Sequence, residues 1–376
     1  MLVFGNSVIA DSILVLLGIV GVIQLYYIFF QFSGVGFKKI SSAKSSKYEP
    51  VSVIICARNE LKNLREFLPQ ILKQDYPQFQ VVVVNDCSWD ESSKFLEKME
   101  DAHFNLKVIT INEHEKYQHG KKFALTLGIK GAAFERLIFT DADCYPSSDQ
   151  WLKLMVDTLS IDKEIVVGYG AYQKTSGFLN KWIRFDTAQN GLLFLSRALK
   201  GKAYMGVGRN LGYLKSLFFK NKGFASHNHL LSGDDDLFVN ETANGNNVGV
   251  CLSSEAFTYS KPKETIKDWL RQKRRHMSSG KYYKSRDKRL IGFYFFTQTL
   301  FWILIVISLL LKLNLEIVVA VLSTRLIAQI IVYWTGFRKL GEKDLIILIP
   351  IFDLIAAIIY PLLAITNPFI KIRVWK

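Results

Sequence analysis

Two carboxylates separated by a single residue follow a short apolar run near the middle of the chain. Residues 137–140 have the composition of a buried strand and lead directly into Asp141 and Asp143. Because residues i and i+2 of an extended chain point the same way, these two side chains can converge at the end of the strand. Carboxylate oxygens suit Mg²⁺ or Mn²⁺, and either ion can in turn bind a diphosphate. Asp141 and Asp143 are therefore candidate metal ligands, although this spacing alone is more often a turn or a helix cap.

Three successive acids form a second candidate site. Asp234, Asp235 and Asp236 precede an apolar Leu-Phe-Val run. Adjacent carboxylates repel one another, so their presence there favours a metal, a positively charged partner or a proton-transfer role over packing. An acidic loop in solvent is the alternative.

Two further segments carry groups suited to nucleotides or phosphates. Asp86 follows the second predicted strand and could accept hydrogen bonds from a base or a ribose, whereas Asp90 is more simply the N-cap of the next helix. Residues 268–276, Asp-Trp-Leu-Arg-Gln-Lys-Arg-Arg-His, predict a helix that groups its arginines, and guanidinium groups suit phosphate. A basic amphipathic helix on a membrane surface is the rival interpretation, and the two are compatible.

The elements that must position these residues alternate between strand and helix. Strands are predicted at 51–56, 80–84, 107–111 and 137–140, and helices at 59–72, 90–100 and 122–133. This order predicts a parallel α/β sheet, which binds ligands at the carboxyl ends of its strands, where the polar residues gather. A P-loop ATPase and a Rossmann dehydrogenase are disfavoured, because no GxxxxGK[ST] occurs and residues 206–212 lack the GxGxxG spacing.

The composition indicates a membrane protein. The chain has 376 residues, 49% of them hydrophobic, with a mean hydropathy of +0.15 and a net charge of +15. A chain that is both apolar and basic usually lies against anionic phospholipid or phosphate, and this composition excludes disorder, collagen and small disulfide scaffolds. The four cysteines have no CxxC spacing, so they indicate neither a zinc site nor a disulfide framework, and we expect reduced thiols in a cytosolic domain.

The apolar residues are concentrated at the two ends of the chain. Residues 13–30, with 8–10 before them, are long enough to cross a bilayer. A signal peptide is the competing interpretation, but no Lys or Arg precedes the run and no small-residue cleavage site ends it, which favours an uncleaved anchor. Four lysines follow in a Ser-rich linker, so the positive-inside rule places the next domain in the cytoplasm. They are Lys38, Lys39, Lys44 and Lys47.

Three apolar segments, 290–311, 317–334 and 345–365, follow the middle domain. Three crossings would put the basic tail with Lys371, Arg373 and Lys376 outside, against the charge rule, so the last segment is either a third span or a re-entrant hairpin broken by proline.

Two charged residues, Arg325 and Asp353, lie well inside the last two apolar segments. Charges inside a membrane span are costly, so they mark either a functional site or a pair joined between helices. The sequence supports the two interpretations equally.

The predicted organisation has five parts. They are an anchor at 1–34, a basic Ser-rich linker at 35–49, a catalytic domain at 50–260, an amphipathic interface helix region at 261–289 and a membrane bundle at 290–376.

Taken in order over residues 51–281, these motifs resemble those of the membrane-embedded family 2 glycosyltransferases, which include hyaluronan, cellulose and poly-N-acetylglucosamine synthases and ceramide glucosyltransferase. The resemblance implies a GT-A-like, mostly parallel nucleotide-binding sheet with helices on both faces, flanked by N- and C-terminal transmembrane helices. The motifs that carry it are VIICARNE (53–60), VNDCSWD (84–90), Gly-Lys-Lys (120–122), Asp-Ala-Asp (141–143), the acidic triplet and QKRRH (272–276).

The resemblance also implies a role for each motif residue. Donor or nucleotide contacts fall on Ala57, Arg58, Glu60, Asp86, Lys121, Lys122, Asp141 and Asp143, the last two also holding the metal. Asp235 is the implied catalytic base, with Asp234 and Asp236 as alternatives because the extra acid blurs the register. Gln272 and Arg275 match the QxxRW motif, and His276 stands where Trp is usual, which leaves the acceptor-stacking role unassigned.

The implied activity is inverting transfer of a hexose or N-acetylhexosamine from a UDP-sugar, with Mg²⁺ or Mn²⁺, to a lipid or a growing polysaccharide. We expect a multi-pass protein of a bacterial inner or plasma membrane, with its catalytic domain in the cytoplasm against anionic lipids. Arg209 and Asn210 are candidate acceptor contacts. Nothing predicts nucleic acid as a partner or indicates a homo-oligomer. The alternatives are a non-catalytic sugar-nucleotide or polysaccharide-binding protein and a nucleotidyltransferase.

Overall fold

The computed structural model describes residues 2–38, 48–112, 120–160, 162–367 and 370. These residues form two compact units. The α/β unit contains the described residues within the ranges 48–187 and 197–283. The helical unit contains the described residues within the ranges 2–38, 188–196 and 284–370. Three of the predicted linker lysines (Lys39, Lys44 and Lys47) and the predicted basic tail lie outside the described residues.

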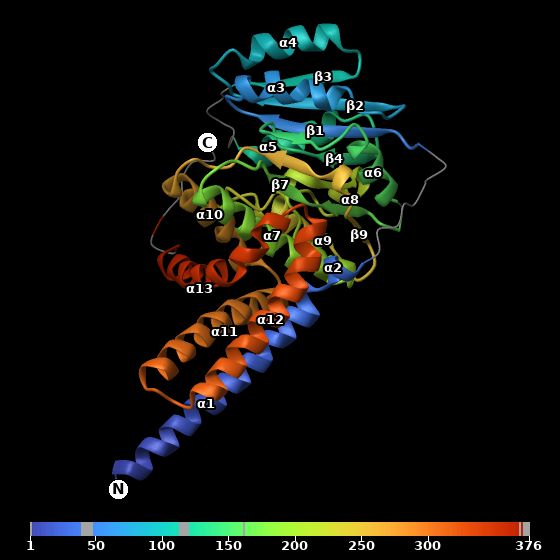
Figure 1. The fold of residues 1–376 in the computed structure, drawn as a ribbon. Helices are drawn as coiled ribbons and strands as arrows, with labels where there is room; N and C mark the ends of the chain where they lie inside the picture. The colour runs from blue at the N-terminus through green and yellow to red at the C-terminus, as the bar shows by residue number, and fades with distance from the viewer. Residues whose placement is uncertain (1, 39–47, 113–119, 161, 368–369, 371–376) are drawn as a thin grey trace. The chain divides into compact units, whose positions relative to one another are not determined.

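A seven-stranded sheet forms the centre of the α/β unit (Figure 1). Its order is β3-β2-β1-β4-β8-β6-β9, and every pair is parallel except those that β8 makes with β4 and β6. The predicted mostly parallel sheet is therefore confirmed. The strands are β1 (Val51–Ala57), β2 (Phe79–Asp86), β3 (Leu106–Ile111), β4 (Arg136–Phe139), β6 (Ile165–Gly168), β8 (Leu211–Leu214) and β9 (Val248–Cys251).

Helices cover both faces of this sheet. All seven residues of β1 are buried, as expected of a β-branched strand covered on both sides. Helix α3 (Leu61–Leu72) connects β1 to β2, and α4 (Ser92–Ala102) connects β2 to β3, so both lead toward the β3 edge of the sheet. Helix α5 (Lys121–Gly131) leads in the opposite direction, from β3 back to β4. Right-handed crossovers place such helices on opposite faces. Helix α5 approaches closely because Gly128 lacks a Cβ, which would lie 2.9 Å from Ile54 Cγ2.

A smaller three-stranded sheet extends the site. Strand β10 (Thr258–Ser260) lies between β5 (Cys144–Pro146) and β7 (Gly170–Tyr172). Strand β5 begins directly after Asp143, so this sheet fixes the chain that leaves the paired carboxylates. The remaining helices of the unit are α6 (Trp151–Thr158), the first part of α7 (Phe178–Leu199), α8 (Lys215–Lys220), α9 (Asp236–Thr242) and α10 (Ile266–Ser279).

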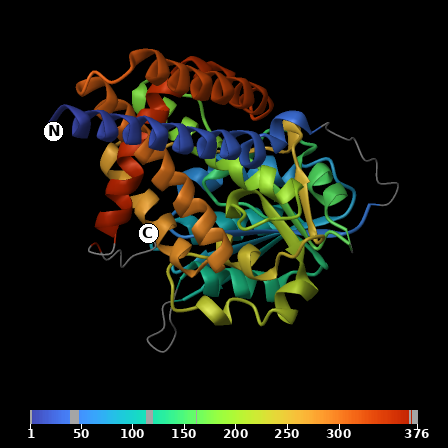
Figure 2. The same ribbon diagram turned by 90° about the horizontal axis from the view of Figure 1, so that it is seen from below.

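Among the residues that the structure describes, the helical unit contains four helices long and apolar enough to cross a membrane, at Val8–Phe32, Ser285–Leu310, Leu315–Lys339 and Lys343–Thr366. Helix α1 (Leu2–Tyr27) continues as a π-helical turn, Ile28–Phe32, and is followed by the short α2 (Gly34–Phe37). The helices α1, α11 (Ser285–Leu310) and α12 (Leu315–Lys339) run side by side (Figures 1 and 2). Their packed core includes Leu17, Val20, Phe301, Leu304 and Val318.

The last apolar segment is one continuous helix. After a 3-10 stretch at Lys343–Leu348, α13 runs from Ile349 to Thr366 through Pro361. Pro350 lies in its first turn, where no intrahelical N–H is needed. The alternative of a hairpin broken by proline is therefore wrong. Figures 1 and 2 show α13 crossing the direction of α11 and α12.

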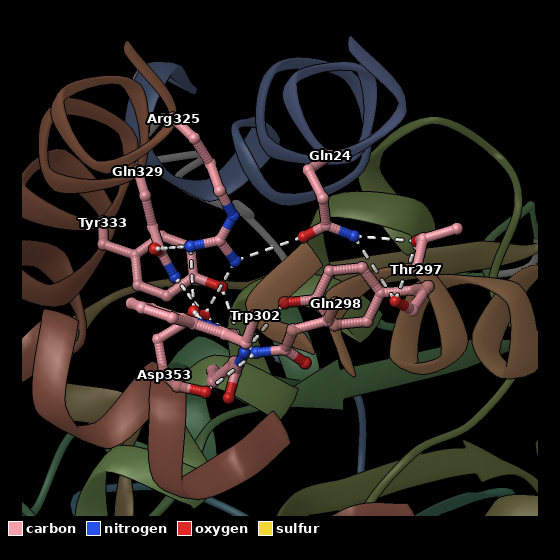
Figure 3. A network of polar contacts seen from close by, with 10 residues as sticks. Gln24, Thr297, Gln298, Trp302, Arg325, Gln329, Tyr333 and Asp353 are labelled. Atoms are coloured by element: carbon pink, nitrogen blue, oxygen red, sulfur yellow. Dashed lines mark hydrogen bonds and ion pairs between the residues drawn. The ribbon is translucent and has the colours of Figure 1, made fainter. Parts of the chain in front are cut away.

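Arg325 and Asp353 pair with each other inside the helical unit (Figure 3). Arg325 Nη1 lies 2.8 Å from Asp353 Oδ2, and Nη2 lies 3.1 Å from Oδ1. The carboxylate also accepts from Gln298 Nε2 (2.7 Å), Trp302 Nε1 (2.7 Å) and Gln329 Nε2 (2.8 Å). Arg325 donates further to Gln24 and Gln329. Both charges are buried and extensively hydrogen-bonded, which supports the pairing interpretation over a separate functional site.

Candidate active site

The polar residues meet at the carboxyl edge of the large sheet. Strands β1 and β2 are parallel neighbours with Ala57 opposite Asn85, so the residues that follow them leave the sheet at the same level. Strand β4 pairs with the other side of β1 and ends at Phe139, two residues before Asp141. Because carboxyl ends of parallel strands share one edge, the sheet brings the three predicted segments together.

Lys121 joins the two acidic motifs. Its Nζ lies 2.9 Å from Asp141 Oδ1 and 2.9 Å from Asp234 Oδ2. Burial alone would lower the pKa of Lys121, but the carboxylates of Asp141 and Asp234 outweigh it and raise this pKa well above its ordinary value. Burial likewise tends to raise the pKa of Asp234, and the Lys121 cation reverses this effect, so that this pKa is lowered. Asp234 is therefore an ionised partner of Lys121 rather than a proton acceptor.

Asp235 lies beside this pair and is held by backbone groups. Its Oδ2 accepts from the Gly208 N–H at 2.7 Å, and its Oδ1 accepts from the Asp236 N–H at 2.7 Å. Burial raises the pKa of Asp235 to about 7, with further contributions from the negative charges of Asp234 and Asp236. A carboxyl group with this pKa can take up and release a proton near neutral pH.

A small pocket opens onto Asp235. Its lining includes both acidic motifs, Lys121 and an apolar wall. The lining residues are Cys56, Lys121, Leu125, Phe139, Thr140, Asp141, Gly208, Leu211, Tyr213, Asp234 and Asp235.

Asp236 has a structural environment. Its Oδ2 accepts from Tyr283 at 2.7 Å and from the Ser279 hydroxyl, and its Oδ1 accepts from the Leu237 N–H at 2.7 Å. Burial raises its pKa, and the two hydroxyl donors oppose this rise. Asp236 thus joins the acidic loop to the segment that follows α10, and the contacts of the three acids single out Asp235 as the candidate base.

The paired carboxylates after β4 have the chemistry of a divalent-cation site. One ligand atom each from Asp141, Asp143 and Cys144 lies within 4.8 Å of the others. Burial and the charge of Asp141 raise the pKa of Asp143, a repulsion that a cation would relieve. Two hard oxygen donors fit Mg²⁺ or Mn²⁺. Burial raises the pKa of Cys144 well above its ordinary value, so this thiol, 3.0 Å from Ser260 Oγ, is a neutral neighbour.

The predicted basic helix, α10, reaches this site through a chain of polar contacts. The Tyr172 hydroxyl donates to Gln272 Oε1 at 3.5 Å, and the Arg209 guanidinium lies 4.4 Å from the Tyr172 ring centre. Arg209 Nη1 also donates to Ser260 Oγ at 3.4 Å. The Arg209 cation also acts to lower the pKa of Asp143, so it lies near the paired carboxylates. Asn210 is fully buried, and its side chain donates to the carbonyls of Tyr169 and Ala256 and accepts from Trp151 Nε1. The expectation that Asn210 contacts the acceptor is therefore wrong.

The other two motif residues of α10 lie near its C-terminal end. The Arg275 carbonyl accepts from Ser232 Oγ at 3.3 Å, which ties the helix to the acidic loop. The surrounding protein and the cations Arg275 and Lys273 lower the pKa of His276 well below its ordinary value. His276 is thus a neutral imidazole.

Helix α10 is fixed against α7 by two contacts spaced one helical turn apart on each helix. Trp269 packs edge-on against Trp182 with ring centres 5.8 Å apart. One turn later, Lys273 Nζ lies 2.8 Å from both carboxylate oxygens of Asp186. Sequence reasoning missed Asp186 and Tyr172, since neither belongs to a motif. The available signal for Asp186 was that it is the single acid of α7.

The predicted nucleotide residues have differing contacts. Asp86 is fully buried, and neither of its carboxylate oxygens has a hydrogen-bond partner among the described residues. Ala57 is buried at the end of β1, and Glu60 Oε2 accepts from Asn63 at 2.6 Å. Lys122 Nζ donates to the carbonyls of residues 227 and 230, at 2.6 and 2.9 Å. Lys122 therefore holds the chain that precedes the acidic loop. These contacts do not support its prediction as a residue that binds the sugar nucleotide.

Two family models match the chain. Glycosyl transferase family 2 matches residues 52–220, and Glycosyl transferase family group 2 matches residues 138–367. Glycosyltransferase AglE of Haloferax volcanii is 34% identical over 112 residues, which are 29% of this chain and 35% of that protein. The poly(ribitol-phosphate) beta-N-acetylglucosaminyltransferase TarS of Staphylococcus aureus is 28% identical over 223 residues, 57% of this chain and 36% of TarS. The chain thus spans about a third of the length of these relatives.

A solved structure shares the fold over almost the whole chain. The mannosyltransferase PcManGT from Pyrobaculum calidifontis, in complex with GDP-Man and Mn²⁺, has a TM-score of 0.60 at 17% identity, and the match covers 96% of this chain and 99% of that one. The fold is accordingly GT-A-like. Since one family model covers more than half of the sequence, the chain belongs to glycosyltransferase family 2.

Proposed function

We propose that the protein is an inverting, metal-dependent glycosyltransferase that moves a hexose or N-acetylhexosamine from a UDP-sugar to a lipid or polysaccharide acceptor at the cytoplasmic face of a bacterial inner or plasma membrane. The observation that carries the proposal is Asp235. It is a half-buried carboxylate with a pKa of about 7 in the same pocket as Lys121 and Asp141.

Asp235 accepts the proton of the acceptor hydroxyl in the proposed step. The acceptor oxygen forms a bond to the anomeric carbon while the bond from that carbon to the diphosphate breaks, so one displacement inverts the anomeric centre. The nucleoside diphosphate leaves with the electron pair. Asp141 and Asp143 would hold Mg²⁺ or Mn²⁺, which when bound supplies charge stabilisation for the diphosphate. Gln272, Arg275 and His276, on α10, would face the diphosphate and the acceptor.

Sequence relatives support the sugar and acceptor classes. TarS is named as an N-acetylglucosaminyltransferase that acts on poly(ribitol-phosphate). The four apolar helices support a membrane location in which the acceptor is a lipid or a polymer. The paired carboxylates Asp141 and Asp143 and the raised pKa of Asp235 disfavour a non-catalytic binding protein, because binding alone does not need a proton acceptor of raised pKa.

A transfer assay tests this function. Membranes that contain the protein receive labelled UDP-sugars with Mg²⁺, Mn²⁺ or EDTA, and the products are partitioned between organic and aqueous phases. We expect label to leave the donor only with a divalent cation, entering the organic phase for a lipid acceptor or high-mass aqueous material for a polysaccharide. Transfer from no UDP-sugar, with nucleotide binding intact, would reject the enzyme in favour of the binding protein.

The rate of transfer should depend on pH through Asp235. Since the base must be ionised and burial raises its pKa to about 7, kcat/KM should rise about tenfold between pH 6 and pH 8 and level off above. Asp236→Asn should move the midpoint to lower pH, because it removes a neighbouring negative charge. Initial rates in buffers of constant ionic strength measure the profile. A flat profile over this range would contradict the role of Asp235.

A further inference from the structure

An arginine and a tryptophan stack on each other where the chain leaves β1 and β2. The Arg58 guanidinium carbon lies 5.7 Å from the centre of the Trp89 ring. Trp89 is 76% exposed, whereas tryptophan side chains are on average largely buried. An exposed aromatic ring at the ligand-binding edge of a parallel sheet suggests a contact with a ligand.

The two loops that carry this pair are fixed to each other. The Asn59 N–H donates to Ser88 Oγ at 2.9 Å, and the Trp89 N–H donates to Asn59 Oδ1 at 2.9 Å. Leu61 N–H donates to Asp90 Oδ2 at 3.1 Å. Asn59 has a left-handed backbone conformation, with φ of 55°. Bonds of this kind fix the backbones of the two loops that carry Arg58 and Trp89 before any ligand arrives.

Unsatisfied polar atoms lie at the same edge. The Asp86 carboxylate is fully buried, and neither of its oxygens has a hydrogen-bond partner in the described part of the chain. Arg58 Nε is also buried without a partner there. Ala57 pairs with Asn85, so Arg58 and Asp86 follow neighbouring strands at one level. Buried acceptors without partners are costly, which indicates that a ligand supplies donors here.

We propose that Trp89, backed by Arg58, is the stacking platform for the base of the nucleotide donor. This inference rests on the proposed function, because it assigns a residue to the donor of that reaction. Indole and guanidinium faces both stack on bases, and such stacking is tolerant of base identity. Trp89 therefore contributes affinity for any nucleoside diphosphate, whereas Asp86 selects among bases by the hydrogen bonds that it accepts.

Binding measurements on the purified full-length protein test the platform. Titration calorimetry in detergent with Mn²⁺ gives the Kd of UDP, GDP and inorganic pyrophosphate for wild type, Trp89→Phe and Trp89→Ala. We expect Trp89→Ala to weaken UDP and GDP by roughly 5- to 100-fold, Trp89→Phe to retain most of the affinity, and pyrophosphate binding to stay unchanged, since only the first two ligands carry a base.

The matched control is Phe104→Ala. Phe104 is fully exposed in the loop before β3, at the amino edge of the sheet, and its removal should leave every Kd unchanged. Equal UDP affinity in wild type and Trp89→Ala, or an equal loss for UDP and pyrophosphate, would overturn the platform while leaving the proposed function intact. Failure of wild type to bind either nucleotide would instead reject the proposed function together with this inference.

Discussion

Asp235→Asn should lower the rate of glycosyl transfer by about 10²- to 10⁴-fold while the Kd for UDP stays near that of wild type. The amide has the size of the carboxylate, and its oxygen can still accept from the Gly208 N–H. Its NH₂ group cannot accept from the Asp236 N–H, so one local hydrogen bond is lost. The amide cannot accept a proton from the acceptor hydroxyl. Single-turnover transfer from a labelled UDP-sugar measures the rate, and calorimetry measures the Kd.

Asp236→Asn is the matched control for this prediction. This substitution makes the same change, from a carboxylate to an amide, at the adjacent residue. The Asp236 side chain contacts Ser279 and Tyr283 rather than the pocket. We expect its activity above pH 8 to remain within about tenfold of wild type, because it removes no reacting group. Should Asp236→Asn abolish transfer and Asp235→Asn retain it, the base would be Asp236.

The strands that carry the site could be predicted closely, because their residues have a strong local pattern. β1, β2, β3 and β4 begin and end within two residues of the predicted bounds, since β-branched runs such as 53–55 and 81–84 have few alternatives to a buried strand. β8 was not predicted. Its four residues, Leu-Gly-Tyr-Leu, have no distinctive pattern, and its antiparallel place between β4 and β6 follows from the rest of the sheet.

Motif order located the candidate site, but contacts between distant segments were needed to assign the acidic triplet. Asp234 pairs with Lys121, which is more than 100 residues away in sequence. Asp236 accepts a hydrogen bond from Tyr283, which is 47 residues away. These contacts distinguish both acids from Asp235. The pairing of Lys273 with Asp186 is likewise a long-range contact. No local pattern encodes such partners, so the sequence alone does not decide which of the three aspartates is the candidate catalytic base.

Removing one partner of the buried pair Arg325–Asp353 should strongly destabilise the helical unit. Arg325→Leu leaves the fully buried Asp353 carboxylate without its cation, and Asp353→Leu leaves the guanidinium without its anion. Either change should cost about 3–5 kcal/mol, because an uncompensated buried charge remains. Thermal unfolding in detergent, followed by intrinsic fluorescence, measures the loss for each variant.

The double variant Arg325→Leu/Asp353→Leu separates a structural pair from a functional one. It removes both charges together, so we expect it to be more stable than either single variant, as found when buried ion pairs are replaced by apolar residues. Glu316→Gln, an exposed acid in the first turn of α12, should change stability by less than about 0.5 kcal/mol. If the double variant recovers stability and transfer together, the pair serves helix packing. Recovered stability without transfer would mean that these charges take part in the reaction, and a double variant no better than the worse single one would show that the two side chains act independently.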